Sequence, residues 1–475
     1  MIKKTSYSSL INGKWVDSKK TLNIYNPSNG EILGELFDVG PKGAENAVNS
    51  ADKAFRTWSS ETAKFRSNIL KNWYKLIIEK KTELAEIITL ESGKPLNESL
   101  VEVDYGASFI EWFAEQALRT KGDVLSSPEK RKKMFIVKQP IGVVSAITPW
   151  NFPLAMVTRK AAAAIAAGCT VVLKPSELTP ISAITLADLS IKSGLPAGVF
   201  NVVNGEPKAI GEVLSTHPLV KKITFTGSTK VGKDLMKNAA DTIKGISLEL
   251  GGNAPFIIFD DAVIDDSIDG LIDSKFRNAG QTCISSNRVF VHEKIKDEFI
   301  QKLKQRIMKL KVGSGMKNSD IGPLISKKAV EKINEHIEDA LNFKGNIEMG
   351  GKSHQAGELF YEPTIITNVN ENMKIFKNEN FGPVIPIIFF NDDDEVIKLA
   401  NNTEYGLAAY FFTSNSKRIW KIVEELEFGM FGINSGKIST YLNPFGGMKE
   451  SGIGREGSSE GLEPFLEKKF ISWSL

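Results

Sequence analysis

Cys283 is the residue of this chain whose surroundings best suit a nucleophile. It lies in Phe276-Arg-Asn-Ala-Gly-Gln-Thr-Cys-Ile-Ser-Ser-Asn-Arg288, among small and hydrogen-bonding residues. Nearby cations and backbone donors favour the thiolate form of a cysteine. The other cysteine, Cys169, lies in the apolar run Ala-Ala-Gly-Cys-Thr-Val-Val-Leu, which is typical of a structural position. The local sequence leaves two interpretations of Cys283 open, a catalytic nucleophile or a small buried residue.

Two further side chains have the chemistry that such a nucleophile needs. Glu249 lies in the strand-like run Ser-Leu-Glu-Leu, and a glutamate buried there is either paired or raised in pKa. A glutamate with a raised pKa suits a general base. Asn151, in Thr-Pro-Trp-Asn-Phe-Pro, follows another apolar strand and can donate to a developing oxyanion. A helix cap is the alternative interpretation of Asn151.

Other polar or glycine-rich stretches at strand ends suit a nucleotide. Lys174-Pro-Ser-Glu177 follows Val-Val-Leu and can hold ribose hydroxyls, although such residues usually face solvent. Gly227-Ser228 lies between an apolar strand and a predicted helix, which indicates a phosphate site or an ordinary turn. It matches neither the Gly-x-Gly-x-x-Gly fingerprint nor a Walker loop. The loops Glu379-Asn-Phe-Gly-Pro383 and Asn443 to Glu456 are rich in glycine. Two interpretations are open: either loop brings the backbone close to a ligand, or it is an ordinary turn.

Alternating strands and helices are predicted to position these residues. Strand–helix alternation indicates a parallel sheet with helices on both faces, and ligands bind at the carboxyl ends of such strands. The first such region has expected strands at 141–147, 170–174, 199–203, 222–226 and 246–250, and helices at 153–167, 179–193, 207–215 and 230–240. A second α/β region has expected strands at 256–259, 288–292 and 384–390, and helices at 262–279, 293–311 and 326–343.

The two ends of the chain show different patterns. Short strands are expected within residues 11–40, and helical periodicity then predicts three helices at 43–58, 63–92 and 97–120. Residues 134–138 read as a strand, and the stretch from 468 to 475 resembles an edge strand. We expect another element or another subunit to complete that edge.

Composition excludes several classes of function. The 475 residues are enough for two or three domains. The net charge is +3, from 60 basic and 57 acidic residues without a basic, aromatic-interleaved run, so nucleic acid is not an expected partner. The four histidines are scattered, so no metal site is expected. Two cysteines without framework spacing indicate a reducing compartment, and neither a membrane span nor a signal peptide is visible, which predicts a cytoplasmic protein.

The motifs taken in order resemble the aldehyde dehydrogenase superfamily. They are Pro-Trp-Asn-Phe-Pro, Lys-Pro-Ser-Glu, Phe-Thr-Gly-Ser, Leu-Glu-Leu-Gly-Gly, Gly-Gln-Thr-Cys, Glu-x-Phe-Gly-Pro and Pro-Phe-Gly-Gly. The resemblance implies an aldehyde dehydrogenase-like α/β fold with a Rossmann-type NAD(P)-binding domain, a second α/β catalytic domain and a β bridging arm, in a homodimer or homotetramer. The implied boundaries are 1–121 and 141–251 for the NAD(P)-binding domain, 252–431 for the catalytic domain, 432–458 for a return to the first, and 122–140 with 459–475 for the oligomerisation arm.

The same resemblance assigns roles to residues. Cys283 matches the catalytic thiol and Glu249 the general base, while Asn151 and the Cys283 backbone N–H match the oxyanion hole. The implied reaction oxidises an aldehyde through a cysteine thioester, which water activated by Glu249 hydrolyses; CoA-acylating relatives generally lack this base. A non-catalytic ligand-binding relative is a remote alternative, because these three residues are intact. The cofactor site would comprise Trp150, Lys174, Pro175, Ser176, Glu177, Gly227, Ser228, Leu250, Glu379 and Phe381.

Cofactor choice depends on Glu177 and its neighbours. A carboxylate at this position accepts hydrogen bonds from a free ribose 2′-hydroxyl and repels a 2′-phosphate, which favours NAD. Ser176 and nearby lysines would still admit NADP if Glu177 turned away.

Two arginines indicate the substrate class. Arg277 precedes the cysteine and Arg159 follows the Asn151 turn, and two guanidinium groups near one pocket repel unless an anion lies between them. The alternative is that either arginine pairs with a structural acid. Their motifs resemble the succinate-semialdehyde dehydrogenase branch, in which a serine matched by Ser439 also contacts the carboxylate. The expected substrate is succinic semialdehyde, with glutaric semialdehyde as the alternative, because one methylene discriminates by only ~1–3 kcal/mol. Ser285 stands where some members of this branch carry a second cysteine, so no disulfide switch is expected.

Overall fold

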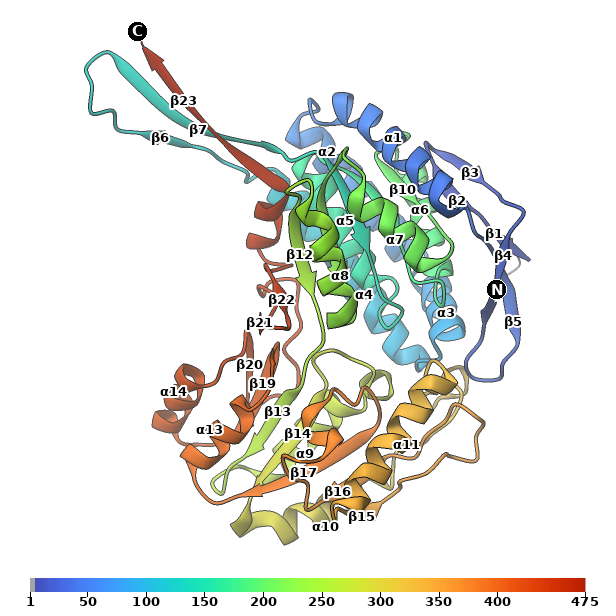
Figure 1. The fold of residues 1–475 in the computed structure, drawn as a ribbon, viewed down its shortest axis with the longest axis vertical. Helices are drawn as coiled ribbons and strands as arrows, with labels where there is room; N and C mark the ends of the chain where they lie inside the picture. The colour runs from blue at the N-terminus through green and yellow to red at the C-terminus, as the bar shows by residue number, and fades with distance from the viewer. Residues whose placement is uncertain (1–4, 475) are drawn as a thin grey trace.

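The computed structural model describes residues 5–474 and arranges them as two lobes and an arm. The first lobe contains the elements up to β12, apart from the arm, and the second lobe contains the elements from β13 to β20 (Figure 1). The arm consists of β6, β7 and β23, and it projects from the first lobe and carries the C-terminus. This arrangement confirms the predicted α/β class with parallel sheets.

The sheet of the first lobe reverses its strand order at its centre. From β8 the chain adds β9 and β10 on one side, and β11 and β12 on the other, all parallel. Such a reversal opens a crevice at the carboxyl ends of the two strands between which it occurs. The order is β22 (Gly452–Ile453), β12 (Gly245–Glu249), β11 (Val220–Thr226), β8 (Val143–Ile147), β9 (Thr170–Lys174), β10 (Phe200–Val202), β2 (Ser9–Ile11), β3 (Lys14–Val16).

Helices cover this sheet, and one prediction about them is wrong. The expected single helix over 63–92 is two helices, because Lys80 between them has φ −101° and ψ 13°. Helix α5 is buried along its whole length, which its alanine-rich sequence allows. The helices are α1 (Gly40–Trp58), α2 (Ala63–Glu79), α3 (Lys81–Ser92), α4 (Leu96–Ala117), α5 (Ala155–Ala167), α6 (Ile181–Lys192), α7 (Pro207–Thr216) and α8 (Thr229–Ala240).

The second lobe is built on another largely parallel sheet. Its central strands β13 and β14 are buried along their whole length, as strands covered on both faces of a parallel sheet are. The order is β15 (Asn346–Met349), β16 (Thr364–Thr367), β17 (Val384–Phe390), β14 (Ser286–His292), β13 (Ala254–Ile258), β19 (Ala408–Phe412), β20 (Met430–Ile433). The helices are α9 (Ile264–Lys275), α10 (Lys296–Ile307), α11 (Lys327–Asn342), α12 (Lys374–Lys377), α13 (Asp393–Asn401) and α14 (Ser416–Glu425).

The helix predicted over 262–279 ends early. Helix α9 stops at Lys275, and a short 3₁₀ turn from Arg277 to Gly280 follows it. Within that turn Asn278 and Ala279 have φ of 51° and 55°, a left-handed conformation that interrupts an α-helix. The residues directly before Cys283 therefore form a loop with a defined backbone conformation and not a continuation of the helix.

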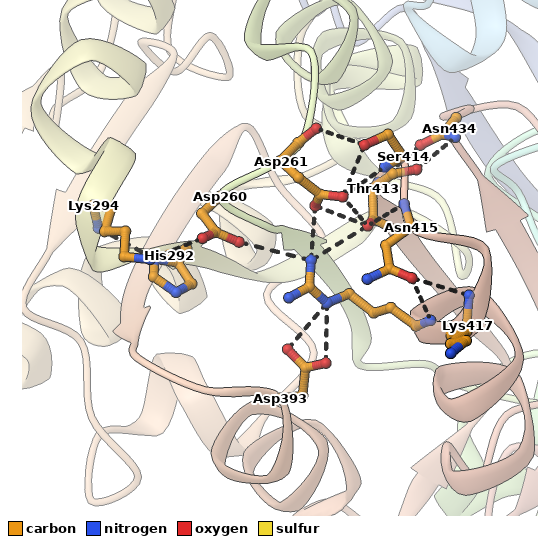
Figure 2. A network of polar contacts seen from close by, with 11 residues as sticks. Asp260, Asp261, His292, Lys294, Asp393, Thr413, Ser414, Asn415, Lys417 and Asn434 are labelled. Carbon is orange, nitrogen blue, oxygen red and sulfur yellow. Dashed lines mark hydrogen bonds and ion pairs between the residues drawn. The ribbon is translucent and has the colours of Figure 1, made fainter.

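A network around Arg418 closes the carboxyl edge of the second sheet (Figure 2). The Arg418 guanidinium lies 2.8 Å from Asp261 Oδ1 and 3.0 Å from Asp393 Oδ2, and it stacks over Phe259 at 4.5 Å. Thr413, directly after β19, donates to Asp261 from its hydroxyl at 2.8 Å. These contacts join the loops after β13 and β19 to helices α13 and α14, so this edge of the sheet is filled by polar packing.

The arm pairs two segments that are far apart in sequence. Strand β23 (Leu466–Ser474) runs antiparallel to β7 (Lys132–Pro140), and β6 (Asp123–Leu125) lies on the other side of β7. The element that completes the predicted C-terminal edge strand is thus β7 of the same chain. Within residues 5–474, no helix is long and apolar enough to cross a membrane.

Short strands complete the fold and link the lobes. The strand β21 (Met448–Lys449) pairs with β18 (Tyr405–Gly406) of the second lobe, whereas β22 pairs with β12 of the first. Segment 432–458 therefore lies against both lobes. A separate small sheet contains β1 (Ser6–Tyr7), β5 (Ile32–Phe37) and β4 (Thr21–Tyr25).

Candidate active site

A cavity of about 280 Å³ lies where the two lobes meet. The first lobe contributes the carboxyl ends of its strands β8 and β11, and the second contributes the amino ends of β13, β14 and β17. The cavity brings together residues that are dispersed in the sequence. Of the predicted site residues, those that line it are Trp150, Asn151, Arg159, Gly227, Ser228, Leu250, Arg277, Cys283, Glu379, Phe381 and Ser439.

Five predicted residues lie beside the cavity and do not line it. Glu249 is the last residue of β12, directly before Leu250 in the cavity wall, and its side chain is buried. Of the other four, Lys174 ends β9 and Pro175 to Glu177 follow it, and the neighbouring strand β8 leads to Asn151. The Thr148 N–H donates to the Lys174 carbonyl at 3.1 Å, so these two strand ends are directly joined.

Cys283 is positioned by the loop that precedes β14. The side chain of Gln281 is buried and braces this loop: its Nε2 donates to the Asn278 carbonyl at 3.0 Å, and its Oε1 accepts from the Ile325 N–H at 2.9 Å. Gly252 lies against the other side, where a Cβ would clash with the Cys283 carbonyl oxygen. The loop is therefore held from two directions and fixes the position of the sulfur.

The surroundings of Cys283 disfavour its thiolate. The side chain is partly exposed to the cavity, yet burial by the surrounding protein raises the pKa of the thiol to about 12. Glu379 and Glu249 raise this pKa further, whereas Arg159 and Arg277 lower it. Attack by this sulfur therefore requires that a neighbouring group remove the thiol proton or that a positively charged group bind nearby and stabilise the thiolate.

Asn151 presents an amide to the cavity. One N–H of its Nδ2 donates to the Gln281 carbonyl at 3.1 Å, and its backbone carbonyl accepts from Lys94 Nζ at 2.7 Å. The side chain is thereby oriented while the second N–H of Nδ2 is left without a partner among residues 5–474. This donor suits an oxyanion that forms next to Cys283.

Glu249 shares a buried cluster with Glu456, Lys160 and Arg159. Burial and then Glu456 raise the pKa of Glu249 well above its usual range, and Arg159 and Lys160 oppose the shift. Its Oε2 has no hydrogen-bond partner among residues 5–474. A carboxyl group with a raised pKa and a free oxygen fits a general base. Burial works against the charge of Glu456, but Lys160 and Arg159 lower the pKa of that residue.

The two arginines differ in their partners. Arg159 is buried, and its Nε lies 2.7 Å from Glu456 Oε2, so the expected alternative of pairing with a structural acid holds for this arginine. Arg277 lies over the Phe152 ring at 5.2 Å, and within residues 5–474 its guanidinium has no hydrogen bond or ion pair. Arg277 is therefore the more available of the two for an anionic ligand.

Another part of the cavity wall has an acceptor, a helix cap and an aromatic pair. Ser228, in the cavity wall, caps α8 by accepting the Val231 N–H, so this helix begins at the cavity. Burial raises the pKa of Glu379 to about 7, and its Oε1 accepts the Gly252 N–H at 3.1 Å. Trp150 and Phe381 meet edge to face with ring centroids 5.6 Å apart.

Comparison with known proteins identifies the family. The model of the aldehyde dehydrogenase family matches residues 15–471. The chain belongs to the aldehyde dehydrogenase family. It is 50% identical over 466 residues to the succinate-semialdehyde dehydrogenase [NADP(+)] GabD of Escherichia coli, covering 98% of this chain and 97% of that protein. It is 48% identical to a glutarate-semialdehyde dehydrogenase of Pseudomonas aeruginosa, covering 97% and 96%. The crystal structure of a Burkholderia pseudomallei succinate-semialdehyde dehydrogenase superposes with a TM-score of 0.98 at 47% identity, covering 99% and 98%.

The site of this aldehyde dehydrogenase also contains residues that sequence reasoning did not single out. Tyr105 on α4 and Lys332 on α11 line the cavity, and both occupy ordinary helical positions that carry no local signal. Glu456 ends a glycine-dense loop, and nothing local predicts that it pairs with Arg159 and Lys160. Phe445, whose ring lies in the cavity wall, is part of the Pro-Phe-Gly-Gly motif, so a sequence motif did mark this position.

Proposed function

We propose that this protein oxidises succinic semialdehyde to succinate with NAD(P). The observation that carries the proposal is Arg277, a guanidinium that makes no ion pair within the described chain, in the same cavity as Cys283. A carboxylate at the far end of a short aldehyde would pair with the Arg277 guanidinium, and the aldehyde carbon at the other end would reach the Cys283 sulfur. The names of the relatives support an ω-carboxy aldehyde.

The residues of the crevice fit a dinucleotide. Gly227, Ser228 and the start of α8 would hold the pyrophosphate, Lys174 and Glu177 the adenosine ribose, and Glu379 the nicotinamide ribose. Gly251 supports this fit, because a Cβ there would stand 3.2 Å from Tyr405 and 3.4 Å from Glu379 and narrow the cavity. When bound, the nicotinamide supplies the hydride acceptor of the oxidation.

The protein's own residues account for the remaining chemistry. The Cys283 thiol releases its proton to solvent as its sulfur adds to the aldehyde carbon, and the free N–H of Asn151 with the Cys283 backbone N–H stabilises the resulting oxyanion. Loss of hydride leaves an acyl thioester on Cys283. Glu249 then takes a proton from water, the hydroxide adds to the thioester carbonyl, and the carboxylic acid leaves as the C–S bond breaks. Cys283 is regenerated.

The choice between NAD and NADP rests on Glu177. Its Oε2 lies 2.9 Å from Lys174 Nζ, so the carboxylate is held where a ribose would bind. A carboxylate there favours NAD, whereas the similarity to a relative named for NADP(+) favours NADP. We therefore assign NAD(P) as the cofactor, and the rates with NAD and with NADP decide between the two.

The test of the substrate assignment compares wild type with Arg277→Ala. Hydrogen bonds to charged groups contribute ~1.5–3 kcal/mol, so the variant should raise the KM for succinic semialdehyde roughly 10- to 100-fold. Initial rates of reduced-cofactor formation are measured with NAD and NADP in parallel, and with glutaric semialdehyde and butanal as competing substrates. Arg119→Ala, which removes an exposed guanidinium on the first lobe, is the control. A wild type that prefers butanal, or an indifferent Arg277→Ala, would exclude the carboxylate site.

The resemblance to aldehyde dehydrogenases also suggests the oligomeric state and the domain boundaries. We propose a homodimer or homotetramer held by the arm, with residues 1–121 and 141–251 as the NAD(P)-binding domain and 252–431 as the catalytic domain. Exposed aromatic side chains on the arm support this, because such groups rarely stay in water. A cytoplasmic location is proposed from the cysteine content, and both cysteines are free in the structure.

A further inference from the structure

Tyr105 lies on the face of α4 that packs against α5. Glu102, Tyr105, Gly106 and Phe109 share this face at intervals of three and four residues. Gly106 allows the close approach of the two helices, because a Cβ there would clash with the Leu154 side chain. The position of Tyr105 is therefore fixed relative to α5.

Helix α5 is tied to α4 at its start. Oε1 of Glu102 accepts the N–H groups of Leu154 and Ala155 at 3.0 and 3.3 Å, which satisfies two donors at the N-terminus of α5. Arg159 lies one turn further along α5 and also contacts the rings of Phe109 and Phe445, at 6.0 and 4.2 Å. Tyr105 and Arg159 thus enter the cavity from two helices that are locked together.

Both residues bring a buried donor without a partner. Among residues 5–474, neither the Tyr105 hydroxyl nor Nη1 of Arg159 makes a hydrogen bond, and both atoms are buried. A buried polar group that stays unpaired costs ~1–3 kcal/mol. Two such groups that line one cavity indicate that an acceptor completes them when it binds.

The charges around these donors identify the acceptor as an anion. Burial works against the charge of Arg159, but Glu456 and then Tyr105 raise its pKa, so the guanidinium is positive and the phenol is close to it. Glu456 is shared by Arg159 and Lys160, so two basic side chains face this one carboxylate. Arg277 and Ser439 line the same cavity.

We propose that Tyr105 donates its hydroxyl hydrogen bond to the carboxylate of the substrate and is a specificity-determining residue for ω-carboxy aldehydes. The inference rests on the proposed function. It explains how the cavity rejects uncharged aldehydes: an alkyl end leaves the donors of Tyr105 and Arg159 unpaired. A site built to hydrogen-bond a group discriminates strongly against analogues that lack it.

Tyr105→Phe tests this proposal because it removes only the hydroxyl and keeps the ring. The quantity measured is the ratio of kcat/KM for succinic semialdehyde to kcat/KM for butanal. We expect the ratio to fall roughly tenfold, mainly through a higher KM for succinic semialdehyde, as the loss of one hydrogen bond to a charged group implies. Tyr25→Phe, which removes a half-exposed hydroxyl on the small N-terminal sheet, is the matched control and should leave the ratio unchanged.

A binding measurement separates the two hypotheses. Titration calorimetry of succinate into the cofactor-free protein should show weaker binding to Tyr105→Phe than to wild type, with the Tyr25→Phe control unaffected. If wild type prefers succinic semialdehyde but Tyr105→Phe keeps both the ratio and the succinate affinity, the role of Tyr105 is excluded and the proposed function stands. If wild type prefers butanal, the proposed function itself fails.

Discussion

In the proposed mechanism, the Glu249 carboxyl would link catalysis to stability. Burial and Glu456 raise its pKa well above the usual range, so it is protonated at pH values where an exposed glutamate is ionised. A general base must be deprotonated, so hydrolysis of the thioester should accelerate as the pH rises through this raised pKa. A carboxyl whose pKa is raised by folding stabilises the fold below its unfolded pKa, and this contribution is lost as the pH rises.

We predict that Glu249→Gln traps the enzyme after the first chemical step. Removing the base should lower kcat by ~10²–10⁴-fold while Cys283 still forms the thioester. Rapid mixing with substrate and cofactor should give a burst of one reduced cofactor per active site, and intact mass should show acylated protein.

The pH profile provides the second readout for this variant. Wild-type kcat should rise with pH, and Glu249→Gln should lack the part of this rise that the raised pKa of Glu249 produces, whereas the fall of thermal stability at high pH should be smaller in the variant. Glu83→Gln, on an exposed pair with Lys80, should behave as wild type. Full steady-state turnover by Glu249→Gln would refute the assignment of the base.

At the scale of elements, the loop that holds Cys283 depends on backbone contacts between the lobes. Gly252 lies between β12 and β13, its N–H donates to Glu379, and its Cα faces the Cys283 carbonyl. We predict that Gly252→Ala displaces the Cys283 loop and lowers kcat/KM by roughly 10²-fold, because misplacement by about 1 Å can have that effect.

Steady-state kinetics and thermal unfolding together check this prediction. Gly211→Ala is the matched control, since its Cβ meets nothing within 4 Å and alanine is the better helix former on α7. The control should retain full activity. Unchanged kcat/KM in Gly252→Ala would show that the Cys283 loop tolerates a shift.

Strand–helix alternation and strand-end motifs were the parts of this protein that the sequence could predict. Parallel strands put Asn151, Gly227 and Glu249 at one edge, because their motifs directly follow apolar runs. Contacts between distant elements were not predictable. The apolar periodicity continues through Lys80 and so does not predict the break between the two helices there. No local sequence pattern predicts the ion pair between Arg159 and Glu456.

At the scale of the whole molecule, the arm exposes apolar groups that a partner subunit would cover. Val124, Phe470 and Trp473 are 76%, 56% and 58% exposed on its strands. We predict that the double variant Phe470→Glu with Trp473→Glu dissociates the assembly, because charges at a buried interface oppose association. Size-exclusion chromatography with light scattering measures the mass.

Met308→Glu controls for the added charge, since Met308 is also exposed but follows α10 in the second lobe, far from the arm (Figure 1). It should elute as wild type does. A double variant that keeps the wild-type mass would show that the arm does not hold the subunits together.

The pairing of β23 with β7 sets an order of events during synthesis. The register joins Leu466 to Pro140, so β7 leaves the ribosome long before its partner exists. At ~5–20 residues per second, translation of the intervening segment takes roughly 15–65 s. Throughout that interval one edge of β7 is open and able to pair with other nascent chains. Slow translation of the second lobe should therefore favour misassembly on polysomes, and a chaperone that covers strand edges should raise the yield.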